Sequence, residues 1–206
     1  MTTGIRLHTL QGESLEAYIA DLARLRITVF KDFPYLYDGD LDYEQQYLQT
    51  YIDCPDAAII IAKDGDQVVG AASCLPMRDE DTAFQHAFLD TPHNAETIDV
   101  DSLFYCAESV LDKRYRGQGI GVQFFHYREA HAARLGGFTH ACFCAVDRPQ
   151  DHPLRPADYT PLDHFWQKRG YQKQADRQAQ FAWKDIDQAV STTKTLTFWL
   201  KTLCTP

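Results

Sequence analysis

Residues 102–121 read SLFYCAESVLDKRYRGQGIG and contain the clearest structural signal in the chain. They begin with an apolar run, 102–111, whose length fits a β-strand. A glycine-rich turn follows it, and from Val122 to Leu135 apolar residues recur at helical spacing until Gly136-Gly137, a suitable helix stop. Residues 138–146 are again strand-like. The segment predicts a strand–turn–helix–strand unit, which forms a right-handed parallel crossover.

The rest of the chain adds strands and helices around this unit. Asp64-Gly65 predicts a hairpin turn between strands 57–62 and 67–72. Helical spacing begins at Ser14 and ends before Pro34, and residues 79–97 form a polar, partly helical excursion. Further strands are expected at 5–10, 178–184 and 194–202, and further helices at about 42–53 and 162–169. This order favours a mixed α/β fold around a mixed central sheet.

The length and composition are typical of an ordinary folded protein with one domain. The 206 residues are enough for one core, so residues 1–206 are expected to form a single domain. The net charge of −9 argues against a nucleic-acid partner and mildly favours a basic or amine-bearing one. No apolar run reaches membrane-spanning length, and the start of the chain lacks a signal core, so we expect no membrane partner and a cytoplasmic protein. The six cysteines form no C-x-x-C pair, which favours free buried thiols.

The glycine-rich turn has the chemistry of a phosphate-binding loop. A strand that ends in such a turn presents free backbone N–H groups at the positive end of the next helix. Gly117, Gly119 and Gly121 allow close approach of a ligand, and Arg114 and Arg116 add positive charge. A pyrophosphate is therefore the expected occupant. The alternative is a tightly packed turn with no ligand.

The spacing of this loop differs from two common nucleotide-binding motifs. It lacks both the G-x-G-x-x-G of dinucleotide-binding folds and the Gly-Lys-Ser/Thr of a P-loop. Its pattern is R-x-x-G-x-G, from Arg114 through Gly117 to Gly119, and it resembles the acetyl-CoA pyrophosphate loop of the GNAT superfamily (GCN5-related N-acetyltransferases). Residues 162–171 also resemble a later helix of that family, with Phe165-Trp166 and Gly170-Tyr171. The resemblance covers an acetyl-CoA-binding core of about 57–172.

The resemblance implies a fold, a cosubstrate and a reaction. The fold would be a mixed, mostly antiparallel sheet with one parallel strand pair splayed around acetyl-CoA and helices on both faces. An amine of an unidentified small molecule or polypeptide would attack the thioester directly in a ternary complex, without a metal. The acyl group could be acetyl or another one. The implied cofactor-binding residues are Val110 and Leu111, which would bond the pantetheine arm, and Arg114, Arg116, Gly117, Gln118, Gly119, Ile120 and Gly121.

Glu108 is the candidate general base, because it is the carboxylate inside the apolar run 102–111. Desolvation there would raise its pKa toward the useful range. The alternatives are a strand-end glutamate that pairs with an arginine or faces water. The general acid is harder to assign, since many family members have a tyrosine where this chain has Trp166, and indole does not donate a proton as a phenol does. Tyr159 is the weaker candidate for that role.

An aromatic loop supplies candidates for the acceptor pocket. Tyr35 and Tyr37, with Phe33 and Tyr43 nearby, would line it, or these rings would simply cap the sheet.

Two further sequence patterns have more than one interpretation. His140, Cys142 and Cys144 alternate on one strand, but a straight strand rarely gathers ligands around one ion, so core filling is preferred to a metal site. Strand 195–200 is apolar on both faces and is compatible with a homodimer or with burial inside one subunit.

Two other functional hypotheses remain open from the sequence. The protein could be a CoA-binding regulatory or sensor module with little or no catalysis, which Trp166 favours. The glycine loop could also be a structural turn that binds no cofactor. Amine-dependent release of CoA separates the first hypothesis from an acetyltransferase, and cofactor binding separates the second.

Overall fold

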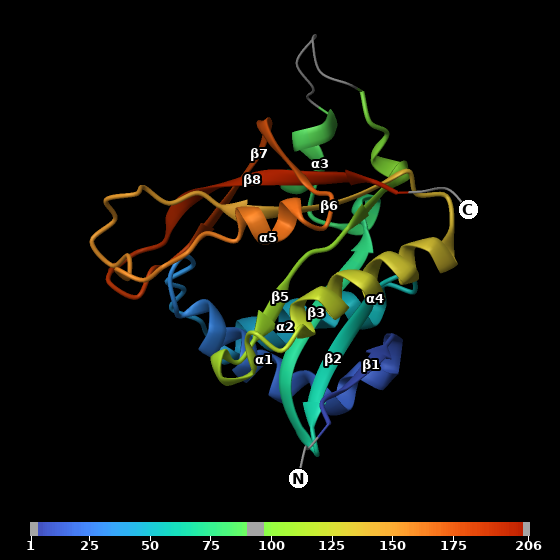
Figure 1. The fold of residues 1–206 in the computed structure, drawn as a ribbon, viewed down its shortest axis with the longest axis horizontal. Coiled ribbons are helices and arrows are strands. Elements are labelled where there is room, and N and C mark those ends of the chain that lie inside the picture. The colour runs from blue at the N-terminus through green and yellow to red at the C-terminus, as the bar shows by residue number, and fades with distance from the viewer. Residues whose placement is uncertain (1–3, 90–96, 204–206) are drawn as a thin grey trace.

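The computed structural model describes residues 4–89 and 97–203, which build one sheet with helices on both faces (Figure 1). The sheet order is β1-β2-β3-β4-β6-β8-β7, with β5 also paired to β3. The β4–β6 pair is parallel and the other pairs are antiparallel. The strands are β1 (Arg6–Leu10), β2 (Ala58–Asp64), β3 (Gln67–Pro76), β4 (Leu103–Tyr105), β5 (Ser109–Leu111), β6 (His140–Val146), β7 (Gln172–Trp183) and β8 (Thr192–Thr202). The predicted fold class is confirmed.

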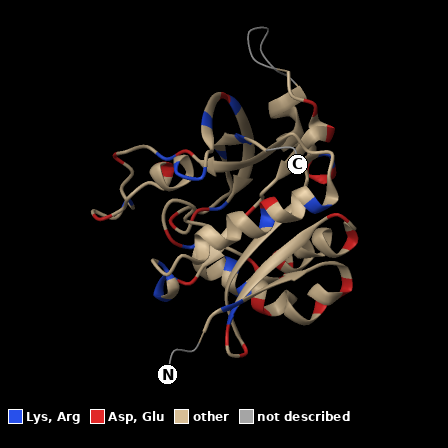
Figure 2. Cartoon of the chain, turned by 45° about the vertical axis from the view of Figure 1, so that its right-hand side comes forward, with Lys and Arg blue, Asp and Glu red and all other residues tan. Residues whose placement is uncertain are grey.

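The helices are α1 (Ile19–Phe30), α2 (Leu41–Asp53), α3 (Thr82–Leu89), α4 (Ile120–Leu135) and α5 (Asp163–Gln167). Short 3₁₀ turns η1 (Gly12–Tyr18), η2 (Met77–Asp79), η3 (Val100–Ser102) and η4 (Lys113–Tyr115) connect them. Where the structure is described, no helix is long and apolar enough to cross a membrane. Basic and acidic segments are interspersed over the fold (Figure 2).

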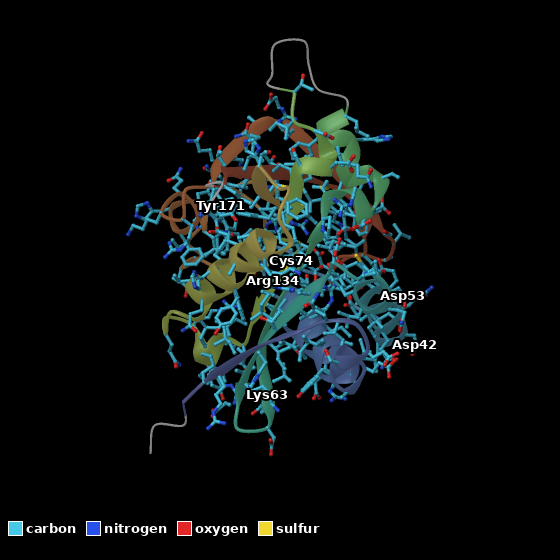
Figure 3. All side chains as sticks on the ribbon, turned by 90° about the vertical axis from the view of Figure 1, so that its right-hand side faces the viewer. Asp42, Asp53, Lys63, Cys74, Arg134 and Tyr171 are labelled. Carbon is cyan, nitrogen blue, oxygen red and sulfur yellow. The ribbon has the colours of Figure 1, made fainter. Side chains whose placement is uncertain are left out.

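Two apolar layers form the core, one on each face of the sheet. Leu22 of α1 and Leu48 of α2 pack against one face together with Ile59, Ile61 and Phe198. Phe124 of α4 and its neighbours pack against the other face with Ile60, Ala72 and Cys74, the last of which is labelled in Figure 3. Alternate residues of the same strand enter opposite layers, so β2 is buried on both faces.

The apolar run 102–111 is not one strand, as the sequence predicts, but two. β4 pairs with β6, where Tyr105 lies opposite Cys142, whereas β5 pairs only with β3. The last link to β6 is the hydrogen bond that the Cys106 N–H donates to the Cys142 carbonyl at 2.7 Å. After this point the chain turns away from β6, and the parallel pair splays apart.

Several other boundaries differ from the expectations. The helix expected from Ser14 begins as a 3₁₀ turn, and the helix at 162–169 is the shorter α5. The first strand of the final hairpin begins at Gln172 rather than near 178, with an irregularity in its pairing between Gln174 and Gln178. β8 lies between β6 and β7, so its two apolar faces and both its edges are accounted for within one chain. Part of the excursion 79–97 and Cys204 lie outside the described residues.

Candidate active site

The glycine-rich loop has the geometry of a phosphate cradle. Gly117 and Gly119 have φ values of 77° and 81°, which favour glycine, and Gly119 is the N-cap of α4 without a side-chain cap. In the described chain the N–H groups of 117–121 donate to no other backbone group. A Cβ atom built at Gly117 or Gly119 meets nothing within 4 Å. Open space and free donors thus coincide at the positive end of a 16-residue helix.

The side chains of the loop differ in what they contribute. Arg114 is exposed but not free, because its Nη2 lies 2.7 Å from Oδ2 of Asp112. Hydrogen bonds from Arg114 lower the pKa of Asp112. The Tyr115 hydroxyl donates to Asp64 at 2.9 Å and so ties the loop to the β2–β3 hairpin. Arg116 and Gln118 are exposed, and the buried Ile120 anchors the start of α4.

Gly121 also has a role in packing. A Cβ atom at this position would lie 3.3 Å from Cζ of Phe165 on α5, so the glycine lets α5 pack closely on α4.

The gap between β5 and β6 is lined by backbone groups that can bind an extended arm. Along a strand the N–H and C=O groups alternate in direction. The Glu108 carbonyl and the Asp112 N–H both bond β3, so residue 110, opposite Ala71, also bonds β3. The backbone groups of Leu111 therefore face the gap, whereas those of Val110 are used in the sheet. Of the two residues expected to bind pantetheine, Leu111 has free backbone groups.

A cavity of about 620 Å³ lies on the α1–α2 side of the sheet. It is lined by side chains from α1, the loop after it, α2, the η2 turn, α3, and strands β4, β6, β7 and β8. Ala107 and Glu108, which separate β4 from β5, are among these residues, so the cavity reaches the point where the strands part. Its tyrosines are Tyr35, Tyr37, Tyr43, Tyr47, Tyr51 and Tyr105.

Glu108 faces this cavity and pairs with an arginine. Its carboxylate contacts Arg26 of α1, and the same guanidinium contacts Glu44 of α2. The Arg26 and Glu44 side chains are 8% and 0% exposed, whereas Glu108 is 24% exposed. The sequence predicts that Glu108 is desolvated within an apolar strand, and the structure does not confirm this. Glu108 is the open end of a buried Glu–Arg–Glu array, which is the alternative of an arginine-paired glutamate.

Glu80 is a cavity residue that the sequence reasoning missed. It follows the η2 turn at the end of β3, and its Oε1 accepts the Asp81 N–H at 3.0 Å. No cation pairs with it in the described residues, and burial raises its pKa to about 7. The only signal in the sequence is its place just after the long apolar strand, in the acidic run Asp79-Glu80-Asp81.

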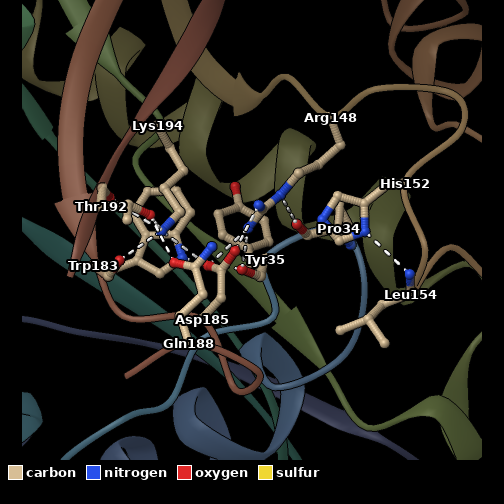
Figure 4. A network of polar contacts seen from close by, with 10 residues as sticks. All are labelled: Pro34, Tyr35, Arg148, His152, Leu154, Trp183, Asp185, Gln188, Thr192 and Lys194. Carbon is tan, nitrogen blue, oxygen red and sulfur yellow. Dashed lines mark hydrogen bonds and ion pairs between the residues drawn. The ribbon is translucent and has the colours of Figure 1, made fainter. Parts of the chain in front are cut away.

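The aromatic loop reaches the cavity and is held there by a buried polar network (Figure 4). Arg148 donates to the Pro34 and Tyr35 carbonyls, each at 2.7 Å, and pairs with the buried Asp185. Lys194 approaches the other oxygen of Asp185 at 3.0 Å. Tyr35 and Tyr37 both line the cavity, as expected for an acceptor pocket.

Tyr159 and Trp166 lie outside this cavity. Tyr159 packs edge-to-face on Phe33 at 4.6 Å, with Arg155 over its ring. Trp166 packs against Phe143 and Trp199 on the α5 side.

Among the described cysteines, which are free thiols, four are buried in the core: Cys74, Cys106, Cys142 and Cys144. Burial raises the pKa of the Cys106 thiol, whose Sγ is 4.0 Å from the Tyr171 hydroxyl. Tyr171, labelled in Figure 3, in turn bonds Glu129 of α4. Cys144 lies on the cavity side, 3.1 Å from the Tyr105 hydroxyl. Within the described chain no group of histidines, cysteines and carboxylates could hold a metal ion.

Comparisons with known proteins agree with this architecture. Residues 22–171 match the family model described as "Acetyltransferase (GNAT) family". No curated protein matches the sequence significantly. A proposed acetyltransferase from Salmonella typhimurium, solved with its cofactor acetyl-CoA, superposes with a TM-score of 0.59 at 11% identity, covering 97% of this chain and 94% of the other. A ribosomal-protein-alanine N-acetyltransferase from Brucella melitensis gives 0.59 at 14% identity and covers 96% and 99%.

The family match spans most of the chain and includes both the glycine loop and the splayed strands. The chain belongs to the GNAT family of acetyltransferases.

Proposed function

We propose that the protein is an acetyl-CoA-dependent N-acetyltransferase in which an amine attacks the thioester directly. The observation that carries this proposal is the continuity of two features: a pyrophosphate-type loop beside a splayed strand pair, and a cavity that opens where those strands part. The loop would hold the pyrophosphate, the free backbone groups of Leu111 the pantetheine arm, and the region of Ala107 and Glu108 the acetyl group. Acetyl-CoA would supply the activated acyl group.

The cavity would then hold the acceptor amine. Before it attacks, the incoming ammonium must lose a proton, and Glu108 is the proposed base because it stands at the boundary between cavity and strand gap. Tyr159 is retained as a weaker proposed acid, which Tyr159→Phe tests by a loss of rate. If Tyr159→Phe keeps the full rate, the departing thiolate takes its proton from solvent instead.

A CoA-binding sensor is the second candidate function, favoured by Trp166. Both functions require cofactor binding, so only turnover separates them. The sensor would release no CoA beyond thioester hydrolysis when amines are added.

The loop can be tested by one charged substitution with a matched control. Gly119→Glu places a carboxylate where the pyrophosphate is expected, and we expect acetyl-CoA binding to weaken by about a hundredfold or more. Gly137→Glu is the control, because Gly137 has the same φ of 81°, equally open surroundings, and a place beyond the other end of α4. Calorimetric titration with acetyl-CoA measures both. Equal binding by the two variants would contradict the loop assignment.

A further inference from the structure

The residues that line the cavity favour a narrower class of acceptor than amines in general. This inference rests on the proposed function. We propose that the acceptor is a small primary amine with an apolar or aromatic body and no anionic group, and that its ammonium is received by the carboxylate of Glu80.

The charges of the cavity favour a cation. Five carboxylates line it, and two cations, Arg26 and Lys184, lie among them. Both cations are already engaged: Arg26 by Glu44 and Glu108, and Lys184 by Asp38 at 2.5 Å. A carboxylate or phosphate on the acceptor would find no free cation in these walls and would lie near unpaired negative charge. Desolvating an anion without a partner is costly, so such acceptors are disfavoured.

The walls also favour an apolar body. Rings of Phe30, Phe84, Phe181 and Trp183 line the cavity beside the six tyrosines. Aromatic faces attract an alkylammonium group and bury hydrocarbon or aromatic surface. A volume of about 620 Å³ lies within the range of small-molecule pockets. Such a pocket suits an amine on a hydrocarbon or aryl frame better than a heavily hydroxylated sugar.

Glu80 is the carboxylate best placed to receive the ammonium. Asp79 lies 3.8 Å from Arg78, and Oδ1 of Asp81 accepts the Ala83 N–H at 2.8 Å. Glu80 has one backbone donor on Oε1, and the described chain offers it no cation. Glu44, also a cavity residue, is fully buried, but Arg26 and the Tyr37 hydroxyl already contact its carboxylate.

Apart from the carboxylates beside it in sequence, the groups around Glu80 are neutral at physiological pH. Beyond the adjacent Asp81, its charge acts on Tyr47 and Tyr51 of α2, Tyr105 of β4 and Cys144 of β6. Burial raises the pKa of each of these phenols and of the thiol, so they stay protonated. Across the cavity Arg26 pairs with both Glu44 and Glu108, so this array carries one more negative than positive charge. An ammonium that reaches Glu80 therefore meets a carboxylate without a cation, in a cavity whose other charges are also negative on balance.

The test is calorimetric binding to the protein saturated with CoA, which cannot donate an acyl group. The probes are 2-phenylethylamine, L-phenylalanine, which adds a carboxylate, and 2-phenylethanol, which lacks the ammonium. We expect the amine to bind at least about tenfold more tightly than either relative. If phenylalanine or a peptide N-terminus binds as well as the amine, the proposal is overturned.

Glu80→Gln keeps the shape of the side chain and removes its charge, and should weaken binding of 2-phenylethylamine by about tenfold or more while leaving 2-phenylethanol unchanged. Glu16→Gln, at an exposed position of η1, is the matched control and should bind as the unmodified protein does. Unchanged amine binding by Glu80→Gln would remove Glu80 from the assignment.

Proton release gives a readout that a merely structural role would not produce. Near pH 6 a carboxyl group with a pKa of about 7 is mostly protonated, and binding of an ammonium favours its ionised form. The binding enthalpy should therefore depend on the ionisation enthalpy of the buffer at pH 6, but not at pH 9 and not in Glu80→Gln. No buffer dependence at pH 6 would contradict the proposal.

Different results would contradict the proposed acetyltransferase function and the proposed class of acceptor. If amines bind as expected but acetyl-CoA and amine give no CoA release, the acetyltransferase function fails and the cavity assignment stands. If peptides or amino acids are acetylated while 2-phenylethylamine is not bound, the function stands and this inference fails.

Discussion

The Arg26 side chain connects several residues of the candidate site. Its guanidinium joins Glu44 and Glu108, and it lies 4.4 Å from the centre of the Tyr47 ring. Breaking a buried ion pair by removing one partner leaves the other charge uncompensated. The array is therefore stable only as a unit, and it ties α1 and α2 to the point where β4 and β5 part.

Arg26→Met should lower the free energy of unfolding by about 3–5 kcal/mol, because it strands the buried Glu44. Arg24→Met on the same helix is the control: Arg24 is 63% exposed and pairs only with Asp21, so its loss should cost less than about 1 kcal/mol. Urea unfolding followed by fluorescence measures both. A similar cost for the two variants would show that the buried array contributes no more than a surface pair.

The two cavity glutamates should differ in their effect on the pH profile. Because the pKa of Glu80 is raised to about 7, its carboxylate forms as pH rises through 7, and kcat/KM for the amine should rise over the same interval. Glu80→Gln should remove this limb and raise KM. Glu108→Gln should leave the limb in place and lower kcat. A limb near pH 7 that survives in Glu80→Gln would assign it to another group.

At the scale of elements, the loop 31–38 depends on the β7–β8 hairpin. The Arg148 guanidinium donates hydrogen bonds to the Pro34 and Tyr35 carbonyls and also to the Asp185 carboxylate. Trp183 Nε1 donates to the same Tyr35 carbonyl at 3.0 Å. Segments more than a hundred residues apart thereby form one wall of the cavity. Loop, hairpin and pocket should respond together to a change in any of them.

Arg148→Met should lower the free energy of unfolding by about 3 kcal/mol at neutral pH, since Asp185 is buried. Burial by itself would raise the pKa of Asp185, but hydrogen bonds from Arg148 and Lys194 lower it on balance. Stability from Asp185 is thus present above its ordinary pKa of 3.8 and is lost as pH falls through the lowered value. The variant's deficit, measured by urea unfolding at several pH values, should shrink in acid. A deficit independent of pH would argue against this network.

The elements also show what the sequence could predict. Periodicity and turn residues located the hairpin at Asp64-Gly65, helix α4 and strand β6, because these signals are local. The division of 102–111 into β4 and β5 was missed, since an apolar run does not reveal which neighbour each half pairs with. Glu80 and the Arg26 array were missed for a similar reason: their partners lie far away in sequence, and single charged residues in α1 or after β3 have no distinctive pattern.

At the scale of the whole molecule, the sheet separates two binding tasks. The α4–α5 side presents the positive end of a helix and the glycine loop, suited to a polyanionic cofactor. The α1–α2 side presents the acidic, aromatic cavity, suited to a cation. Under the proposed function, the splayed strands would be the passage between them. Opposite charge preferences on the two faces would then keep each substrate out of the other's site, while the reactive groups meet within the sheet.

The net charge of −9 should add long-range attraction for a cationic acceptor. Salt screens such attraction over a Debye length of about 10 Å at 0.1 M. We therefore expect kcat/KM for 2-phenylethylamine, at saturating acetyl-CoA, to fall a few-fold as NaCl rises from about 20 to about 500 mM. Sucrose of equal osmolarity is the control and should have little effect, because it carries no charge. A value of kcat/KM that does not change with NaCl would mean that the acceptor gains nothing from the acidic field, and that only short-range contacts in the cavity select it.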